Sequence, residues 1–114
     1  MKHYFFILLG ILVMITLSGC ASKKGLYSWG EYEPQMYQYF NGESPEKLIL
    51  LLEKDIQTAN NDGAKLPPGF YAHLGLLYQS VGRDQDFIVM MELEKASYPE
   101  SRQYIDHLIN NYKR

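Results

Sequence analysis

The sequence contains a single cysteine, Cys20, so no disulfide can form within the chain. Its three histidines include no pair spaced i and i+4 around a glutamate, the arrangement by which a helix binds zinc. Glycine-rich loops of the phosphate-binding type are also missing. Lysine and arginine are not clustered into a basic stripe, which argues against a nucleic-acid-binding protein. No catalytic constellation is found, and we expect a protein that is not an enzyme and holds no metal.

A run without charge, residues 4–17, follows the basic opening Met1-Lys2-His3 and ends at Leu17-Ser18-Gly19-Cys20. This is the layout of a secretory signal. The four final residues resemble the lipobox of bacterial lipoproteins, in which cleavage between Gly19 and Cys20 leaves the cysteine as the first residue. The resemblance implies a diacylglyceryl group and an N-acyl chain on Cys20, and no other cofactor. We therefore expect residues 1–19 to be a signal peptide.

The uncharged run and its terminal cysteine leave two alternatives to lipidation. A transmembrane anchor needs about 20 apolar residues, more than this run provides. A free structural or reactive thiol would leave one unpaired cysteine in an exported chain. Lipidation explains both the position of Cys20 and its being alone, and two or three acyl chains would attach the protein stably. Neither Ala21 nor Ser22 is the aspartate that retains lipoproteins in the inner membrane, so the analogy implies the outer membrane of a Gram-negative bacterium, facing the periplasm.

Beyond the signal, residues 20–26 are expected to form a lipidated tether and residues 27–114 one small helical domain. The mature chain would carry about three more acidic than basic groups, since the full chain has 13 acidic and 11 basic residues and only Lys2 is removed. Lys23 and Lys24 stand beside the cysteine, either as a solvated linker or in contact with anionic head groups.

Aromatic residues are dense from position 27 to 40. Pro34 suits the first turn of a short helix and Asn41-Gly42 its end. Tyr27, Trp29 and Tyr32 precede or open that helix, and two interpretations remain open: they pack onto the following helices, or they form a docking surface for a partner or a sugar ring.

A longer helix is predicted after Ser44-Pro45-Glu46, which combines a capping serine, a proline at the first position and an acidic residue near the positive end of the dipole. Apolar residues recur at helical spacing up to Asn60-Asn61-Asp62-Gly63, which ends the segment. The five apolar residues 48–52 indicate a helix buried on more than one side.

Residues 67–101 contain the most specific pattern. After Pro67-Pro68-Gly69, six residues fall at the intervals of a tetratricopeptide repeat: Tyr71, Leu74, Gly75, Tyr78, Gly82 and Pro99. Gly75 is expected to let a second helix, about 84–97, approach closely. Phe87 and Glu94 occupy positions that are normally small, which predicts a wider crossing than usual, and the acidic residues 84, 86, 92 and 94 are expected to face solvent.

Tyr104, Ile105, Leu108 and Tyr112 predict a closing helix over residues 100–112 that covers the repeat. Repeat matches before residue 67 are weak, and solenoids usually need three units. We therefore expect an all-α protein, a compact bundle of about four to five helices with one tetratricopeptide-like pair.

A closer resemblance is carried by Leu26-Tyr27 with Trp29-Gly30 and Tyr32, by Pro67-Pro68-Gly69 with Ala72-His73-Leu74-Gly75, and by Tyr98-Pro99-Glu100-Ser101. Together with the lipobox, these resemble a family of small uncharacterised proteobacterial outer-membrane lipoproteins. Its members are commonly found beside a lipoprotein related to the curli secretion channel and another small lipoprotein, which implies an envelope assembly of three components. The family implies no functional residue beyond Cys20.

Two functions follow as expectations. The first is a protein-binding adaptor or accessory subunit that uses Tyr27, Trp29 and Tyr32, or a concave side formed by Ala72, Leu76 and Gln79, to hold an envelope partner. The alternative is a lipoprotein that binds peptidoglycan or activates an enzyme through the aromatic segment 27–40.

Overall fold

The protein is all-α in the computed structural model, which describes residues 1–16, 25–30 and 32–114. Cys20, its cleavage site and most of the tether lie outside these residues. The described residues form six α-helices and one 3₁₀ turn, Pro99–Ser101, with no strand but one isolated bridge between Tyr27 and Lys65. The helices are α1 (Lys2–Thr16), α2 (Tyr32–Phe40), α3 (Pro45–Asp62), α4 (Phe70–Ser80), α5 (Asp84–Ser97) and α6 (Arg102–Tyr112).

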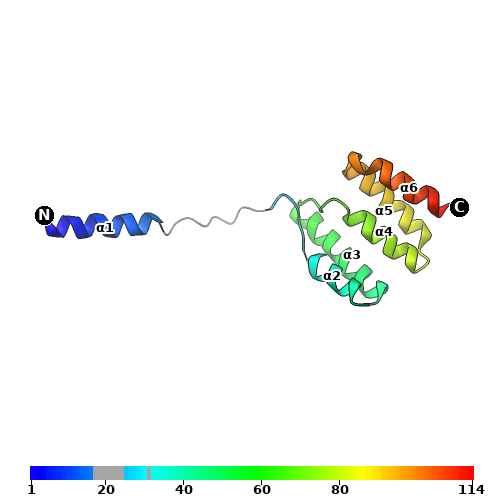
Figure 1. Ribbon diagram of the computed structural model, residues 1–114, viewed down its shortest axis with the longest axis horizontal. Coiled ribbons are helices and arrows are strands. Elements are labelled where there is room, and N and C mark those ends of the chain that lie inside the picture. Colours follow the sequence, from blue (N-terminus) through cyan, green and yellow to red (C-terminus); the bar gives the residue numbers. More distant parts are fainter. Residues whose placement is uncertain (17–24, 31) are drawn as a thin grey trace.

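The molecule is extended, with principal extents of 84 × 30 × 24 Å, and the expected compact shape was wrong. Helix α1 lies apart from the other helices, which are grouped together (Figure 1). From α2 to α6, the helices whose backbones pack most closely are neighbours in the chain: α2 with α3, α3 with α4, α4 with α5 and α5 with α6. In the part of the chain that the structure describes, no helix has the length and apolar character needed to cross a membrane.

Local signals set the ends of α3. The Lys47 N–H donates to Ser44 Oγ at 3.3 Å, and Pro45 opens the helix. Gly63 follows the last turn with φ of +61°, and the Ala64 N–H donates to the Ala59 carbonyl at 2.9 Å. This left-handed cap is the conformation that favours glycine. Both ends of α3 are therefore encoded by residues within or beside it.

Helices α4 and α5 form the most extensive helix pair, joined by a turn at Gly82. A Cβ atom at Gly75 would lie 3.0 Å from Met91 Cε and 3.2 Å from Met90 Cβ. A side chain there would require Met90 or Met91 to shift by a few tenths of an ångström, so the two helices approach closely at Gly75. Phe87 and Glu94, whose bulk led to the expectation of a wider crossing, are both buried.

The hydrophobic core runs through α3 to α6 and is built from fully buried side chains of all four helices: Leu48, Leu52, Phe70, Leu74, Leu77, Phe87, Met91 and Ile105. Tyr78 belongs to this core, and Tyr71 packs against it half-buried. Helix α6 covers α5, and the Phe87 and Tyr112 rings lie 5.0 Å apart.

Two apolar positions differ from the sequence expectation. Leu50 lies within the run 48–52 but is 67% exposed, because α3 has neighbours on two sides and not all round. Tyr104 was placed on the buried stripe of the closing helix and is 59% exposed, whereas Ile109 takes the buried position. Helical spacing identified the buried face of each helix correctly, but that face is narrower than the sequence predicts.

Candidate functional site

A continuous row of aromatic rings crosses the domain from α2 to the end of α5. We call it the ring row; in order it contains Phe40, Tyr39, His73, Tyr32, Trp29, Tyr27 and Tyr98. Neighbouring ring centroids lie between 5.5 and 6.4 Å apart. These separations fall in the range of favourable aromatic pairs, so each ring supports the next.

The ring row is partly core and partly surface. Tyr32 joins it to the core, since its ring lies 5.2 Å from that of buried Phe70. Trp29 remains 47% exposed and Phe40 77% exposed. The two sequence interpretations of the aromatic segment therefore apply to different residues: Tyr27 and Tyr32 are half-buried, and Trp29 is a surface residue between them.

Backbone contacts fix the position of residues 27–30, which include Tyr27 and Trp29. The Ser28 N–H donates to the Lys65 carbonyl at 2.6 Å, which ties this segment to the loop between α3 and α4. Gly30 has φ of +47°, and a Cβ there would lie 2.8 Å from Asp55 Oδ1. Only glycine lets the backbone pass so close to the Asp55 carboxylate. Trp29 is thus presented from a defined backbone position.

A buried polar contact links α2 to α3 beneath the ring row. Gln35 is 4% exposed, and its Nε2 donates to Asp55 Oδ2 at 3.4 Å. Buried polar groups need such partners, because an unpaired one costs about 1–3 kcal/mol. Neither residue was predicted from the sequence, although a charged residue within an apolar helical stripe is a detectable signal.

His73 lies within the row, between Tyr32 at 6.0 Å and Tyr39 at 5.5 Å. Burial lowers the pKa of the His73 imidazole, so the neutral ring is favoured at neutral pH. This histidine is therefore an aromatic member of the row and not a surface charge.

The second predicted surface, Ala72 with Leu76 and Gln79, is not assembled as an open face. Ala72 is buried, and its N–H donates to Glu94 Oε2 at 3.4 Å. Leu76 is 38% exposed, and Gln79 is half-buried. Leu76 is thus the most exposed of the three side chains.

Glu94 is buried beside the beginning of α4, contrary to the solvent-facing position expected for the acidic residues of α5. Its Oε1 accepts a hydrogen bond from the Gly69 N–H at 2.7 Å. Gly69 is the capping position of α4 and has no side chain to accept hydrogen bonds from the first N–H groups of the helix. Glu94 supplies the missing cap from another helix, and its charge complements the positive end of the α4 dipole.

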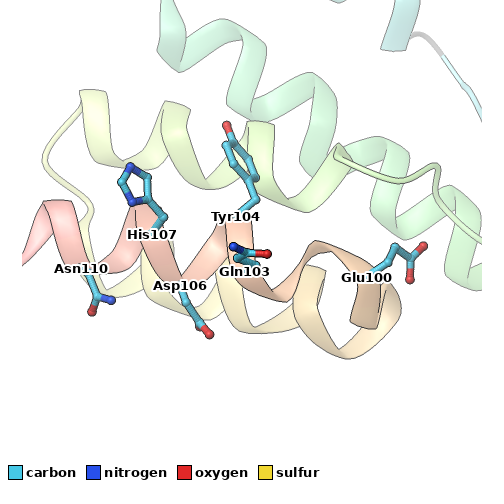
Figure 2. Close-up of a pocket in the computed structure, with 6 residues that line it drawn as sticks. All are labelled: Glu100, Gln103, Tyr104, Asp106, His107 and Asn110. Atoms are coloured by element: carbon cyan, nitrogen blue, oxygen red, sulfur yellow. The ribbon is translucent and has the colours of Figure 1, made fainter.

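A shallow polar depression with a volume of about 670 Å³ lies along α6 (Figure 2). Tyr104 and His107 project to one side of the helix, and Asp106 and Asn110 to the other. Asp106 is paired with Lys95 at 2.8 Å, and His107 Nε2 lies 2.9 Å from Asn111 Nδ2. Asp106 and His107 therefore already have partners and project to opposite sides of the helix, so they are not an acid and a base aimed at a common point.

No group of three or more histidine, cysteine, aspartate or glutamate side chains suited to a metal ion is found within residues 1–16, 25–30 and 32–114. Residues 26–108 match the family described as a domain of unknown function (DUF4810). The chain belongs to this family. The DUF4810 domain thus includes the ring row, α2 to α5 and most of α6. The comparisons with curated proteins and with solved structures found no match.

Proposed function

We propose that this protein is a non-enzymatic lipoprotein of the outer membrane, attached through Cys20, that binds a protein partner in the periplasm with the exposed part of its ring row. The partner is an envelope protein, such as another lipoprotein of the same assembly. We also propose that α4 and α5 form a tetratricopeptide-like hairpin.

The observation that carries the proposal is the exposure of Trp29 between two half-buried members of the ring row, Tyr27 and Tyr32. Tryptophan and tyrosine contribute most to protein interfaces when they are rigid and partly exposed. Trp29 lies between Tyr27 and Tyr32, each 6.4 Å away, so little conformational entropy remains to be lost on binding. The tetratricopeptide-like pattern is supported by the close contact at Gly75 and the turn at Gly82.

Crosslinking in cells, followed by co-purification of the lipidated protein, tests the adaptor function. Trp29→Ala is expected to reduce recovery of the partner at least tenfold, since hot-spot truncation costs about 2 kcal/mol or more. Leu50→Ala is the matched control, because Leu50 is exposed and apolar but lies outside the ring row. Equal recovery by Trp29→Ala and wild type, with helical circular dichroism preserved, would contradict the proposal.

Lipid attachment is tested separately by Cys20→Ser. This variant should leave the membrane fraction for the soluble periplasmic fraction. Retention in membranes after high-salt and carbonate washing would contradict lipidation.

The alternative, binding of peptidoglycan through the same aromatic segment, is favoured by the same exposed Trp29 ring. It predicts that the protein lacking its lipid sediments with isolated peptidoglycan, whereas the adaptor proposal predicts that it remains in the supernatant.

A further inference from the structure

A partly enclosed hollow of about 310 Å³ lies at the Tyr98 end of the ring row. Its lining includes Asn60 near the end of α3, Lys65 in the following loop, Tyr71 of α4, and Ala96, Ser97 and Tyr98 at the end of α5. The volume is at the lower end of the range for small-molecule sites, about 300–1,000 Å³. It is large enough for one side chain or a small organic group.

Two helices present their carboxyl ends to this hollow. Helix α3 ends at Asp62 and α5 at Ser97, and both contribute lining residues from their final turns. The carboxyl end of a helix carries a partial negative charge of about half an electron, on carbonyl groups that lack intrahelical partners. A cation is therefore favoured there.

Carboxylate charges add to this field. Burial first, and then the charge of Glu94, raises the pKa of the Tyr71 hydroxyl. The pKa of Tyr98 is raised to about 12 by burial, with contributions from Tyr27, Glu94 and Glu100. Lys65 supplies the opposing charge and is the only cationic side chain among the described residues that line the hollow.

Aromatic rings are the second attraction for a cation. Tyr71 and Tyr98 both line the hollow, and the Tyr98 hydroxyl donates to the Leu66 carbonyl, which fixes its ring. The faces of such rings attract guanidinium and ammonium groups. The same protein makes this contact elsewhere, since Arg83 Cζ lies 4.2 Å from the centroid of the Tyr78 ring.

We propose that this hollow binds an organic cation, a guanidinium or alkylammonium group, carried by an arginine or lysine side chain of the protein partner. The cation lies against the rings of Tyr71 and Tyr98, close to the carboxyl ends of α3 and α5. The presence of a protein partner rests on the proposed function, whereas cation binding by the hollow does not.

Agmatine, which carries both cationic groups, is the probe for the hollow. Titrated into the full lipidated chain in neutral detergent, it should shift the amide resonances of Ser97 and Lys65 saturably, with a dissociation constant of about 1–10 mM. An uncharged urea analogue of the same length and the dianion glutarate should not shift them. Saturable binding of either comparison compound, or no shift with agmatine, overturns the proposal.

The Lys65→Glu variant tests whether the charge around the hollow determines its affinity for agmatine. Replacing the one opposing charge should tighten agmatine binding by about 3- to 10-fold at low ionic strength. Lys54→Glu is the matched control, since Lys54 is exposed on α3 but does not line the hollow, and it should leave the affinity within about twofold. An equal effect of both variants would mean that only the net charge matters and would contradict the assigned site.

The source of the cation is tested by filling the hollow from within. Ala96→Lys places an ammonium group there, and Thr58→Lys adds the same charge at an exposed position of α3 outside it. Ala96→Lys should abolish agmatine binding and lower partner recovery at least tenfold, while Thr58→Lys should do neither. Agmatine binding lost without any loss of partner recovery would show that the partner does not supply the cation. Because agmatine binding needs no partner, failure of the hollow remains distinguishable from failure of the adaptor function.

Discussion

At the scale of single residues, the buried carboxylate of Glu94 explains how α4 begins without a capping side chain. Helical spacing in the sequence placed Glu94 with the other acidic residues of α5, on a solvated face. The interaction that buries it joins residues 69 and 94, which lie far apart in the chain, so no local pattern could reveal it. In the tetratricopeptide pattern the position of Glu94 is normally occupied by a small residue. A glutamate there showed that the chain departs from the pattern but did not show why.

Glu94→Gln is predicted to destabilise the protein by about 1–3 kcal/mol. Glutamine retains one oxygen acceptor but presents its amide NH₂ group to a backbone N–H, which leaves a buried donor unsatisfied. Urea denaturation monitored by circular dichroism measures the change. Glu92→Gln is the matched control, because Glu92 is an exposed partner of Lys95 and should cost less than about 1 kcal/mol. Equal effects of the two substitutions would contradict the capping role.

Tyr98 makes the stability depend on pH in the alkaline range. Its folded pKa is about 12, above the ordinary value of 10.0, because burial disfavours the charged phenolate. The folded state therefore holds this proton more tightly, and the resulting stabilisation is complete below pH 10 and lost as pH rises to about 12.

Tyr98→Phe should reduce that alkaline loss while lowering stability at neutral pH by about 1 kcal/mol, since the hydrogen bond to the Leu66 carbonyl is removed. Thermal unfolding from pH 7 to 12 provides the measurement. Tyr37→Phe, at an exposed tyrosine of α2, should leave the profile unchanged. A profile of Tyr98→Phe parallel to that of wild type would show that Tyr98 is not responsible.

At the scale of elements, the helices whose ends are encoded locally were the most predictable. Ser44, Pro45 and Gly63 set the limits of α3, and residues 84–97 of the second repeat helix match α5. Helix α2 begins at Tyr32, two residues before the predicted proline, because Pro34 fits anywhere in a first turn. The ring row could be predicted only as an aromatic segment, since its order depends on His73 and Tyr98 from other elements.

Loss of the α3 cap gives a prediction at this scale. Ser44→Ala should destabilise the domain by about 1 kcal/mol, because the Lys47 N–H loses its side-chain acceptor. Thermal unfolding monitored by circular dichroism measures the change, with Thr58→Ala as the control, as Thr58 is an exposed residue in the interior of the same helix. Alanine has the higher helix propensity, so the control should be neutral or slightly stabilising. A Ser44→Ala variant as stable as Thr58→Ala would contradict the capping assignment.

At the scale of the whole molecule, the helices of the domain pack as a series that follows their order in the chain. Each helix from α3 to α5 packs most closely against the helix before it and the helix after it, and α6 packs against α5 at the end of the series. An element at the end of such a series covers apolar surface that nothing else covers. Sequence periodicity predicted α6 as a closing helix, but the linear order of packing required the three-dimensional structure, because amphipathic faces do not specify their neighbours.

Removal of α6 is therefore predicted to unfold or severely destabilise the domain. Ile105 is fully buried and Ile109 is 7% exposed, and burial of two such side chains contributes roughly 3–6 kcal/mol. That is a large part of the roughly 5–15 kcal/mol that typically stabilises a small domain. A chain ending at Ser101 should lose its cooperative thermal transition and bind a hydrophobic dye such as ANS, whereas a chain ending at Tyr112 should behave like the full protein, because Lys113 and Arg114 are exposed. Ile105→Ala provides a milder test, with an expected loss of about 2–5 kcal/mol. Cooperative unfolding at an unchanged temperature in the chain ending at Ser101 would show that α6 does not close the core.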